Sequence, residues 1–159
     1  MTAKLDIIPI VFDTLEQKPW LLIKPDYPDV EMVKKHILCG DYSIVGAEKL
    51  LTIEKKRNLD ELATCCGKGR ERFERQWVRA CEIGYRWKYL ITQGCRYIDV
   101  CEGNYRSKLN PLSFTQTLTD WEDDYGIRLR FVDTDTEAQK LVYSICRHVQ
   151  RKLRIERGG

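Results

Sequence analysis

The chain has 159 residues, of which 43% are hydrophobic and 32% are charged, and its formal net charge is +3. This length and balance are typical of one globular domain and exclude two domains of ordinary size. No apolar run is long enough to span a bilayer, and the N-terminal segment lacks the long apolar region of a signal peptide. We therefore expect a single domain over residues 1–159, with no membrane partner and a cytoplasmic location.

The cysteines number seven, which is odd. They form no C-x-x-C pair, and no histidine stands at zinc-binding spacing from them. We therefore expect free thiols in a reducing compartment, with neither a disulfide framework nor a zinc site.

Strands predominate in the first part of the chain. Alternating apolar and β-branched residues predict strands over residues 6–12, 41–45 and 50–56. The run 20–24 is also apolar and follows a polar turn. Residues 25–38 start as a loop, and we expect one helical turn within them.

The hydrophobic period becomes helical after residue 57. A helix is expected over residues 58–66, where Asn58 has the side chain of a good N-cap. A second helix is expected over residues 70–87, because apolar side chains recur there at every fourth position. These side chains are Phe73, Trp77, Cys81 and Tyr85.

Helices and strands alternate in the rest of the chain. Strand-like runs cover residues 88–94, 96–103 and 127–134, and an amphipathic helix over residues 113–126 ends at a glycine. A long helix is expected over residues 135–155. Its core-facing side chains are Ala138, Leu141, Val142, Ile145, Val149 and Leu153. This order of elements predicts an α/β domain with a mixed β-sheet flanked by helices.

The strands predicted over residues 41–45 and 50–56 bring charged side chains together in a pattern that indicates a catalytic site. If residues 46–49 close a hairpin, Asp41 lies directly opposite Glu54, and the strand period of two places Lys56 on the same face. Opposed carboxylates repel each other, and Mg²⁺ is the kind of cation that prefers one or two carboxylates together with waters and phosphate oxygens. Lys56 beside the metal could stabilise or activate an attacking water, and it would help to neutralise a phosphate in the transition state. The pattern indicates a phosphodiesterase site, and the alternative is a surface ion-pair ladder.

Basic residues gather in two segments, 68–88 and 147–157, while acidic residues gather around residues 120–124. A basic cluster on one face is typical of contact with nucleic acid. Two ordinary solvated helix faces would give the same pattern.

Three segments in order resemble the motifs of the XPF-type structure-specific endonucleases, which carry the ERCC4 domain. The segment from Gly40 to Asp60 is similar to the family's G-D-Y…E-R-K-x-x-x-D motif, through Gly40-Asp41-Tyr42, Glu54-Lys55-Lys56 and Asp60. Asp13 and Glu16 resemble the V-D-x-R-E motif that precedes it. Arg72, Phe73 and Gln76 resemble the later R-F-x-x-Q segment. The resemblance covers roughly residues 8 to 150.

The resemblance implies a restriction-endonuclease-like core and metal-dependent cleavage of branched or flapped DNA, with Mg²⁺ as the metal and Mn²⁺ as a substitute. It also implies a homodimer through the last helices. The metal ligands it implies are Asp13, Asp41 and Glu54, with Glu16 beside them. It makes Lys56 the catalytic lysine and Asp60 a residue that steadies the site. Together with the basic cluster, it gives Lys55, Arg70, Arg72, Arg75 and Gln76 as contacts to DNA or supports of the site.

The chain departs from the family's pattern at two positions. Leu15 stands where the first motif has arginine, and Lys55 stands where E-R-K has arginine, which puts phosphate positioning in doubt. The carboxylates are intact, so we expect an active endonuclease, and the alternatives are a non-catalytic DNA-binding or scaffold subunit and a small-molecule phosphodiesterase. Residues 1–159 include no segment that resembles the family's helix-hairpin-helix module, so we expect a stand-alone nuclease domain, which resembles phage or prophage members.

Overall fold

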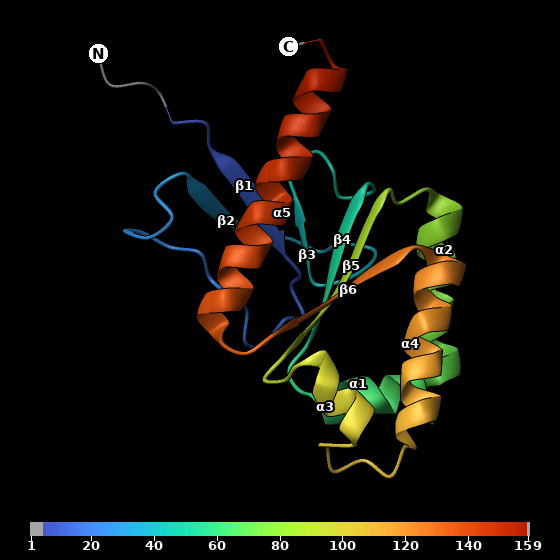
Figure 1. The fold of residues 1–159 in the computed structure, drawn as a ribbon. Coiled ribbons are helices and arrows are strands. Elements are labelled where there is room, and N and C mark those ends of the chain that lie inside the picture. Colours follow the sequence, from blue (N-terminus) through green and yellow to red (C-terminus); the bar gives the residue numbers. More distant parts are fainter. Residues whose placement is uncertain (1–4, 159) are drawn as a thin grey trace.

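The computed structural model describes residues 5–158, which form a six-stranded sheet with helices on both faces (Figure 1). The strand order is β2-β1-β3-β4-β5-β6. β3 runs antiparallel to β1 and β4, and the other neighbouring strands are parallel, so the sheet is mixed as predicted. The strands are β1 (Ile8–Phe12), β2 (Val30–Lys34), β3 (Tyr42–Ile44), β4 (Leu51–Lys56), β5 (Trp87–Gln93) and β6 (Ile127–Val132).

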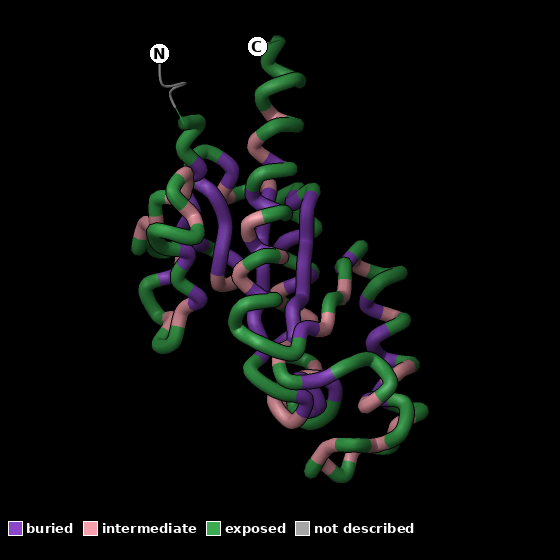
Figure 2. Tube along the Cα trace, turned by 60° about the vertical axis from the view of Figure 1, so that its left-hand side comes forward, coloured by how far each residue is buried: buried purple, intermediate pink, exposed green. Residues whose placement is uncertain are grey.

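Five helices cover the two faces of this sheet within the described residues: α1 (Leu59–Cys66), α2 (Arg70–Ile83), α3 (Tyr97–Glu102), α4 (Pro111–Tyr125) and α5 (Asp135–Glu156). α5 packs on one face, and α1 to α4 gather on the other (Figure 1). Each face therefore has its own apolar core. β3, β4 and β5 are the most buried strands, and α5 becomes exposed toward its C-terminal end (Figure 2). Among residues 5–158, no helix has both the length and the apolar character needed to cross a membrane.

Two predicted segments are wrong. Residues 30–34 form the edge strand β2, paired in parallel with β1, where a helical turn was expected. Pairing with a neighbour distant in sequence decides this segment, and its own pattern does not reveal the neighbour. The strand expected over residues 96–103 is the short helix α3, in which Asp99 accepts a hydrogen bond from the Arg96 amide and Gly103 ends the helix in the left-handed conformation.

The second helix is shorter than predicted. α2 ends at Gly84, whose φ of 99° is left-handed, so Tyr85 lies beyond the helix. Cys81 is exposed, and the buried stripe of α2 consists of Phe73, Trp77 and Ala80. α5 is confirmed, with Ala138, Val142, Ile145 and Val149 buried against the sheet together with Cys146, and with Leu141 and Leu153 partly buried beside them.

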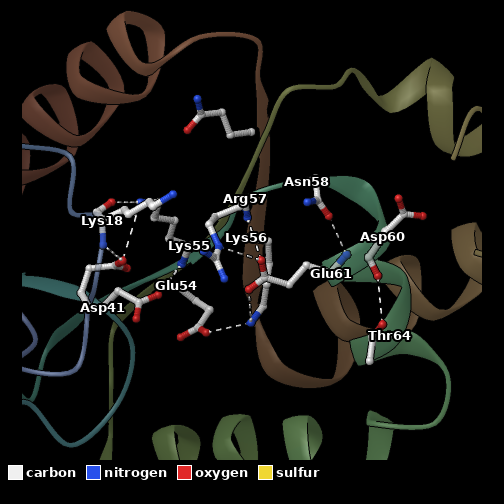
Figure 3. Close-up of polar contacts among 12 residues, drawn as sticks. Lys18, Asp41, Glu54, Lys55, Lys56, Arg57, Asn58, Asp60, Glu61 and Thr64 are labelled. Atoms are coloured by element: carbon white, nitrogen blue, oxygen red, sulfur yellow. Dashed lines mark hydrogen bonds and ion pairs between the residues drawn. The ribbon is translucent and has the colours of Figure 1, made fainter. Parts of the chain in front are cut away.

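The β3–β4 hairpin has the predicted register. Tyr42 pairs with Ile53, as that register requires. The amide of the preceding Asp41 donates to the Ile53 carbonyl at 2.8 Å, and the Asp41 side chain lies beside Glu54 (Figure 3). Gly40 makes this approach possible. Its φ is +80°, and a Cβ there would lie 2.1 Å from Thr52 Oγ1 and 3.0 Å from the Ile53 carbonyl oxygen. A side chain at this position would therefore push β3 away from β4.

We predict that Gly40→Ala destabilises the fold more than Gly46→Ala does. Both glycines have positive φ, which costs alanine about 1–2 kcal/mol, but a Cβ on Gly46 has no neighbour within 4 Å. The overlap at Gly40 should roughly double that cost. Urea denaturation of the two variants measures the difference, and equal losses would show that β3 and β4 can separate freely.

Candidate active site

A hollow of about 930 Å³ opens between α2 and the neighbouring ends of the strands. Arg72, Arg75 and Arg79 of α2 line one wall, and residues 36–38, which follow β2, line the opposite wall. A smaller hollow of about 320 Å³ adjoins it. The two hollows share four lining residues, Leu15, Asp41, Glu54 and Lys56. The residues singled out by the central motif therefore lie where the two hollows meet.

Glu54 and Lys56 are held in fixed positions at this junction. The Lys56 ammonium donates to Glu54 Oε1 at 3.1 Å, and Gln76 of α2 donates to Glu54 Oε2 at 3.0 Å. Both β4 side chains are nearly buried, and the Lys56 ammonium also lies 4.8 Å from the ring centroid of Phe73. Figure 3 shows Asp41 and Glu54 next to each other, with Lys56 joined to Glu54. Gln76 thus supports the site from α2, as the resemblance allows.

The charges at the junction are strongly perturbed. Burial, together with the Glu54 charge, raises the pKa of Asp41 to about 8, although the Lys55 amide donates to Asp41 Oδ2 at 2.7 Å. Burial opposes the charge on Lys56, but Glu54, Cys65 and Glu61 outweigh it and raise the pKa of that lysine. Ionising Asp41 beside Glu54 is therefore unfavourable on its own, and a bound cation would favour the ionised pair.

The donor chemistry fits a hard divalent cation held by two carboxylates. Mg²⁺ is commonly bound by one or two protein carboxylates, with waters and phosphate oxygens completing the shell. Asp41 and Glu54 can supply such a pair. Across residues 5–158, no group of three His, Cys, Asp or Glu side chains is arranged to hold a metal ion. The expected set of Asp13, Asp41 and Glu54 is therefore not assembled as a three-carboxylate cluster.

Asp13 has structural contacts instead. Its Oδ2 accepts from the Leu15 amide at 3.1 Å, and its Oδ1 accepts from the Ile37 amide at 3.0 Å and lies 3.4 Å from His36 Nδ1. The residue is 7% exposed and lines the larger hollow. These contacts connect the segment after β1 to the segment after β2, so Asp13 fixes the shape of the hollow.

Lys55 lies on the opposite face of β4. Its ammonium is 4.7 Å from the Trp20 ring centroid and 3.8 Å from Glu16 Oε1, and it donates to the Lys18 carbonyl. Its side chain is only 4% exposed. This burial does not favour contact with DNA, and it favours the alternative that Lys55 supports the site. Glu16 lines the smaller hollow beside Asp41 and Glu54, as the resemblance implies.

Asp60 and Arg70 do not reach the larger hollow. Asp60 Oδ1 accepts from the amides of Arg106 and Ser107, each at 2.8 Å, and its carboxylate points away from Glu54 (Figure 3). Asp60 therefore steadies the loop before α4. Arg70 donates to Glu74 at 2.7 Å and to Thr117 at 3.0 Å, which joins α2 to α4. The DNA contact expected at Arg70 is thus not supported by the hollows, because its guanidinium is bonded to Glu74 and Thr117 and lines neither hollow.

Trp20 is a supporting residue that the sequence patterns did not single out. Its ring stacks on Tyr42 with centroids 5.5 Å apart, its amide donates to the Tyr42 hydroxyl at 2.7 Å, and its indole nitrogen donates to Gln93 at 2.8 Å. Trp20 thereby fixes the loop after β1 against the hairpin strand that follows Asp41. The only sequence signal was an aromatic residue in an apolar run, which many core positions share.

The mixed sheet and its helices define a restriction-endonuclease-like fold. The chain belongs to the ERCC4 domain family, whose model matches residues 14–145. Two solved structures share the fold, both with a TM-score of 0.65. XPF from Aeropyrum pernix is 21% identical, over 89% of this chain and 61% of that one. XPF from Aeropyrum pernix in complex with DNA is 20% identical, over 91% of this chain and 66% of that one.

The chain thus spans less than two thirds of the length of either XPF structure. No curated protein matches its sequence.

The raised pKa of Asp41 predicts a pH-dependent stability in EDTA. The folded protein keeps the Asp41 proton up to about pH 8, whereas the unfolded chain releases it near 3.8. The folded state therefore binds more protons between these values, and its stability falls as pH rises from about 4 to about 8. Asp41→Asn removes this loss. The free energy of unfolding of the variant, relative to that of wild type, should therefore increase across this pH range and then stay constant.

Urea denaturation at pH 5, 7 and 9 measures that advantage. Glu71→Gln is the control, because the Glu71 side chain is 88% exposed and its effect should not grow across these pH values. Parallel pH profiles for Asp41→Asn and wild type would contradict the prediction.

Proposed function

We propose that the protein is a metal-dependent DNA endonuclease that uses Mg²⁺ and cleaves branched or flapped DNA. One observation carries the proposal: Asp41, Glu54 and Lys56 meet at the base of a hollow whose wall carries arginines. Family membership supports it, and so does the fold shared with an XPF structure solved in complex with DNA.

The residues at the junction have distinct roles in this reaction. When bound by Asp41 and Glu54, a divalent cation would supply Lewis-acid polarisation of the phosphate. Gln76 keeps Glu54 in position from α2. Glu54 raises the pKa of Lys56, which favours the ammonium form, and we assign this ammonium the stabilisation of negative charge on the phosphate in the transition state. Glu16 adds negative charge beside the pair in the smaller hollow.

A non-catalytic scaffold subunit is less consistent with this geometry. Holding Asp41 and Glu54 opposite each other and nearly buried is unfavourable without a cation. A protein without catalytic function would gain stability by replacing Asp41 with a neutral side chain. The buried pair therefore favours an enzyme over the scaffold alternative.

We predict that Asp41→Asn and Glu54→Gln each abolish cleavage while the fold persists, because each removes one metal-facing charge and keeps the shape. The assay uses duplex, flap, fork and four-way-junction DNA, with Mg²⁺ or with EDTA, and circular dichroism checks the fold. Glu71→Gln, on the exposed side of α2, should cleave like wild type. Near-normal cleavage by both site variants, or wild-type cleavage in EDTA, would contradict the proposal.

We propose that the arginine wall binds the phosphate backbone. Arg72, Arg75 and Arg79 follow one flank of α2 and line the larger hollow, and Arg75 has only an exposed ion pair with Glu71 at 3.1 Å. Such contacts give affinity without sequence choice.

We predict that replacing Arg72 and Arg75 together by alanine weakens binding to all DNA substrates alike. Each lost phosphate contact lowers the slope of log affinity against log salt by about 0.9, so the double variant should lose roughly one to two units. Fluorescence anisotropy at several salt concentrations measures this. Arg147 and Arg151 on α5 provide the matched control pair. If their removal has the larger effect, the DNA surface lies on the other face.

We also propose a homodimer formed beside the C-terminal helix. The buried stripe of α5 already packs on the chain's own sheet, so a partner would contact the surfaces that flank this stripe. Light scattering should give about twice the chain mass, and a mass near 18.8 kDa across micromolar concentrations would contradict the dimer.

A further inference from the structure

Leu15 is an apolar side chain in an unusual position. It is 80% exposed, yet it lines both hollows at the place where they share Asp41, Glu54 and Lys56. Single exposed leucines are common and need no explanation on their own. Here the exposed side chain stands beside the proposed scissile position, so its contact with substrate has to be considered.

The loop that carries Leu15 is held at several points. The Leu15 amide donates to Asp13 Oδ2 at 3.1 Å, and the Glu16 amide donates to the Asp13 carbonyl at 3.1 Å. The Lys18 amide donates to Glu16 Oε1 at 3.0 Å, and the Lys18 carbonyl accepts from the buried Lys55 ammonium. Leu15 is therefore presented on a fixed turn, which lowers the entropic cost of pressing it against a ligand.

The hollows on either side of Leu15 differ in size and charge. The larger one has the arginine wall of α2, which suits a phosphate backbone. The smaller one is lined by charges of both signs, including Glu16, Arg57 and Glu61. A DNA strand cut at the junction would pass from the larger hollow to the smaller one, and Leu15 would lie at the step between the two nucleotides.

We propose that Leu15 is a specificity-determining wedge, which inserts into an opened base step beside the scissile phosphate. This inference rests on the proposed function. Apolar side chains that enter DNA in this way must pay for unstacking, and the cost is lowest where stacking is already interrupted. Intact duplex resists the wedge, whereas a flap or fork accepts it at the branch point. Leu15 thereby selects DNA with an interrupted stack.

The test uses the Glu54→Gln protein, which the proposed function expects to bind without cleaving. A 2-aminopurine placed next to the branch point of a flap becomes brighter when it unstacks. Binding should increase this fluorescence, and adding Leu15→Ala should remove most of the increase. The added variant should also weaken flap binding about 10-fold, the loss expected when one leucine side chain is no longer buried, with duplex affinity unchanged.

Leu112→Ala is the matched control, because Leu112 is 75% exposed at the start of α4 and lines neither hollow. It should change neither readout. Equal fluorescence and equal flap-to-duplex preference with and without Leu15 would overturn the wedge. If those readouts are equal while wild type cleaves flap DNA in parallel assays, the wedge is overturned and the proposed function is not. If wild type neither binds nor cleaves any DNA, the proposed function and the wedge fail together.

Discussion

The structure around the site depends on one unfavourable interaction, the opposition of Asp41 and Glu54 across the β3–β4 hairpin. Two carboxylates at neighbouring, mostly buried positions cannot both be charged at low cost, and burial together with the Glu54 charge raises the pKa of Asp41. Gly40 allows the close approach, while Lys56 and Gln76 bind the oxygens of Glu54. These contacts reduce the repulsion without removing it, and a cation bound between the two carboxylates would offset the rest.

The two faces of β4 contact different layers of helices and loops. Glu54 and Lys56 point toward α1 and α2, where the substrate would lie. Lys55 points to the α5 side and holds the loop after β1 through Trp20, Glu16 and the Lys18 carbonyl. The same strand therefore positions Glu54 and Lys56 on one face and the loop after β1 on the other. Burial lowers the pKa of Lys55, so its charge depends on the nearby acidic groups, with Glu16 the strongest among them.

The hairpin and its site were predictable because they follow from local rules. The strand period of two and a short connection bring Asp41 and Glu54 together, and Asn58 caps α1 through its own side chain. β2 was not predictable, because a partner remote in sequence stabilises it. The contacts of Arg70 and Asp60 were not predictable either. Arg70 donates to Thr117 and Asp60 accepts from the Ser107 amide, and both partners are distant in sequence.

The register of the hairpin has a consequence for how this site can be inherited. Side chains alternate between the faces of a strand, so a one-residue slip of β3 against β4 would turn Asp41 toward the α5 side and leave Glu54 unopposed. The length of the connection at residues 45–50 sets that register. A descendant with one residue inserted there would retain each motif residue and still lack the paired carboxylates. The length of this turn therefore decides whether Asp41 and Glu54 meet, although the turn contributes no side chain to the site.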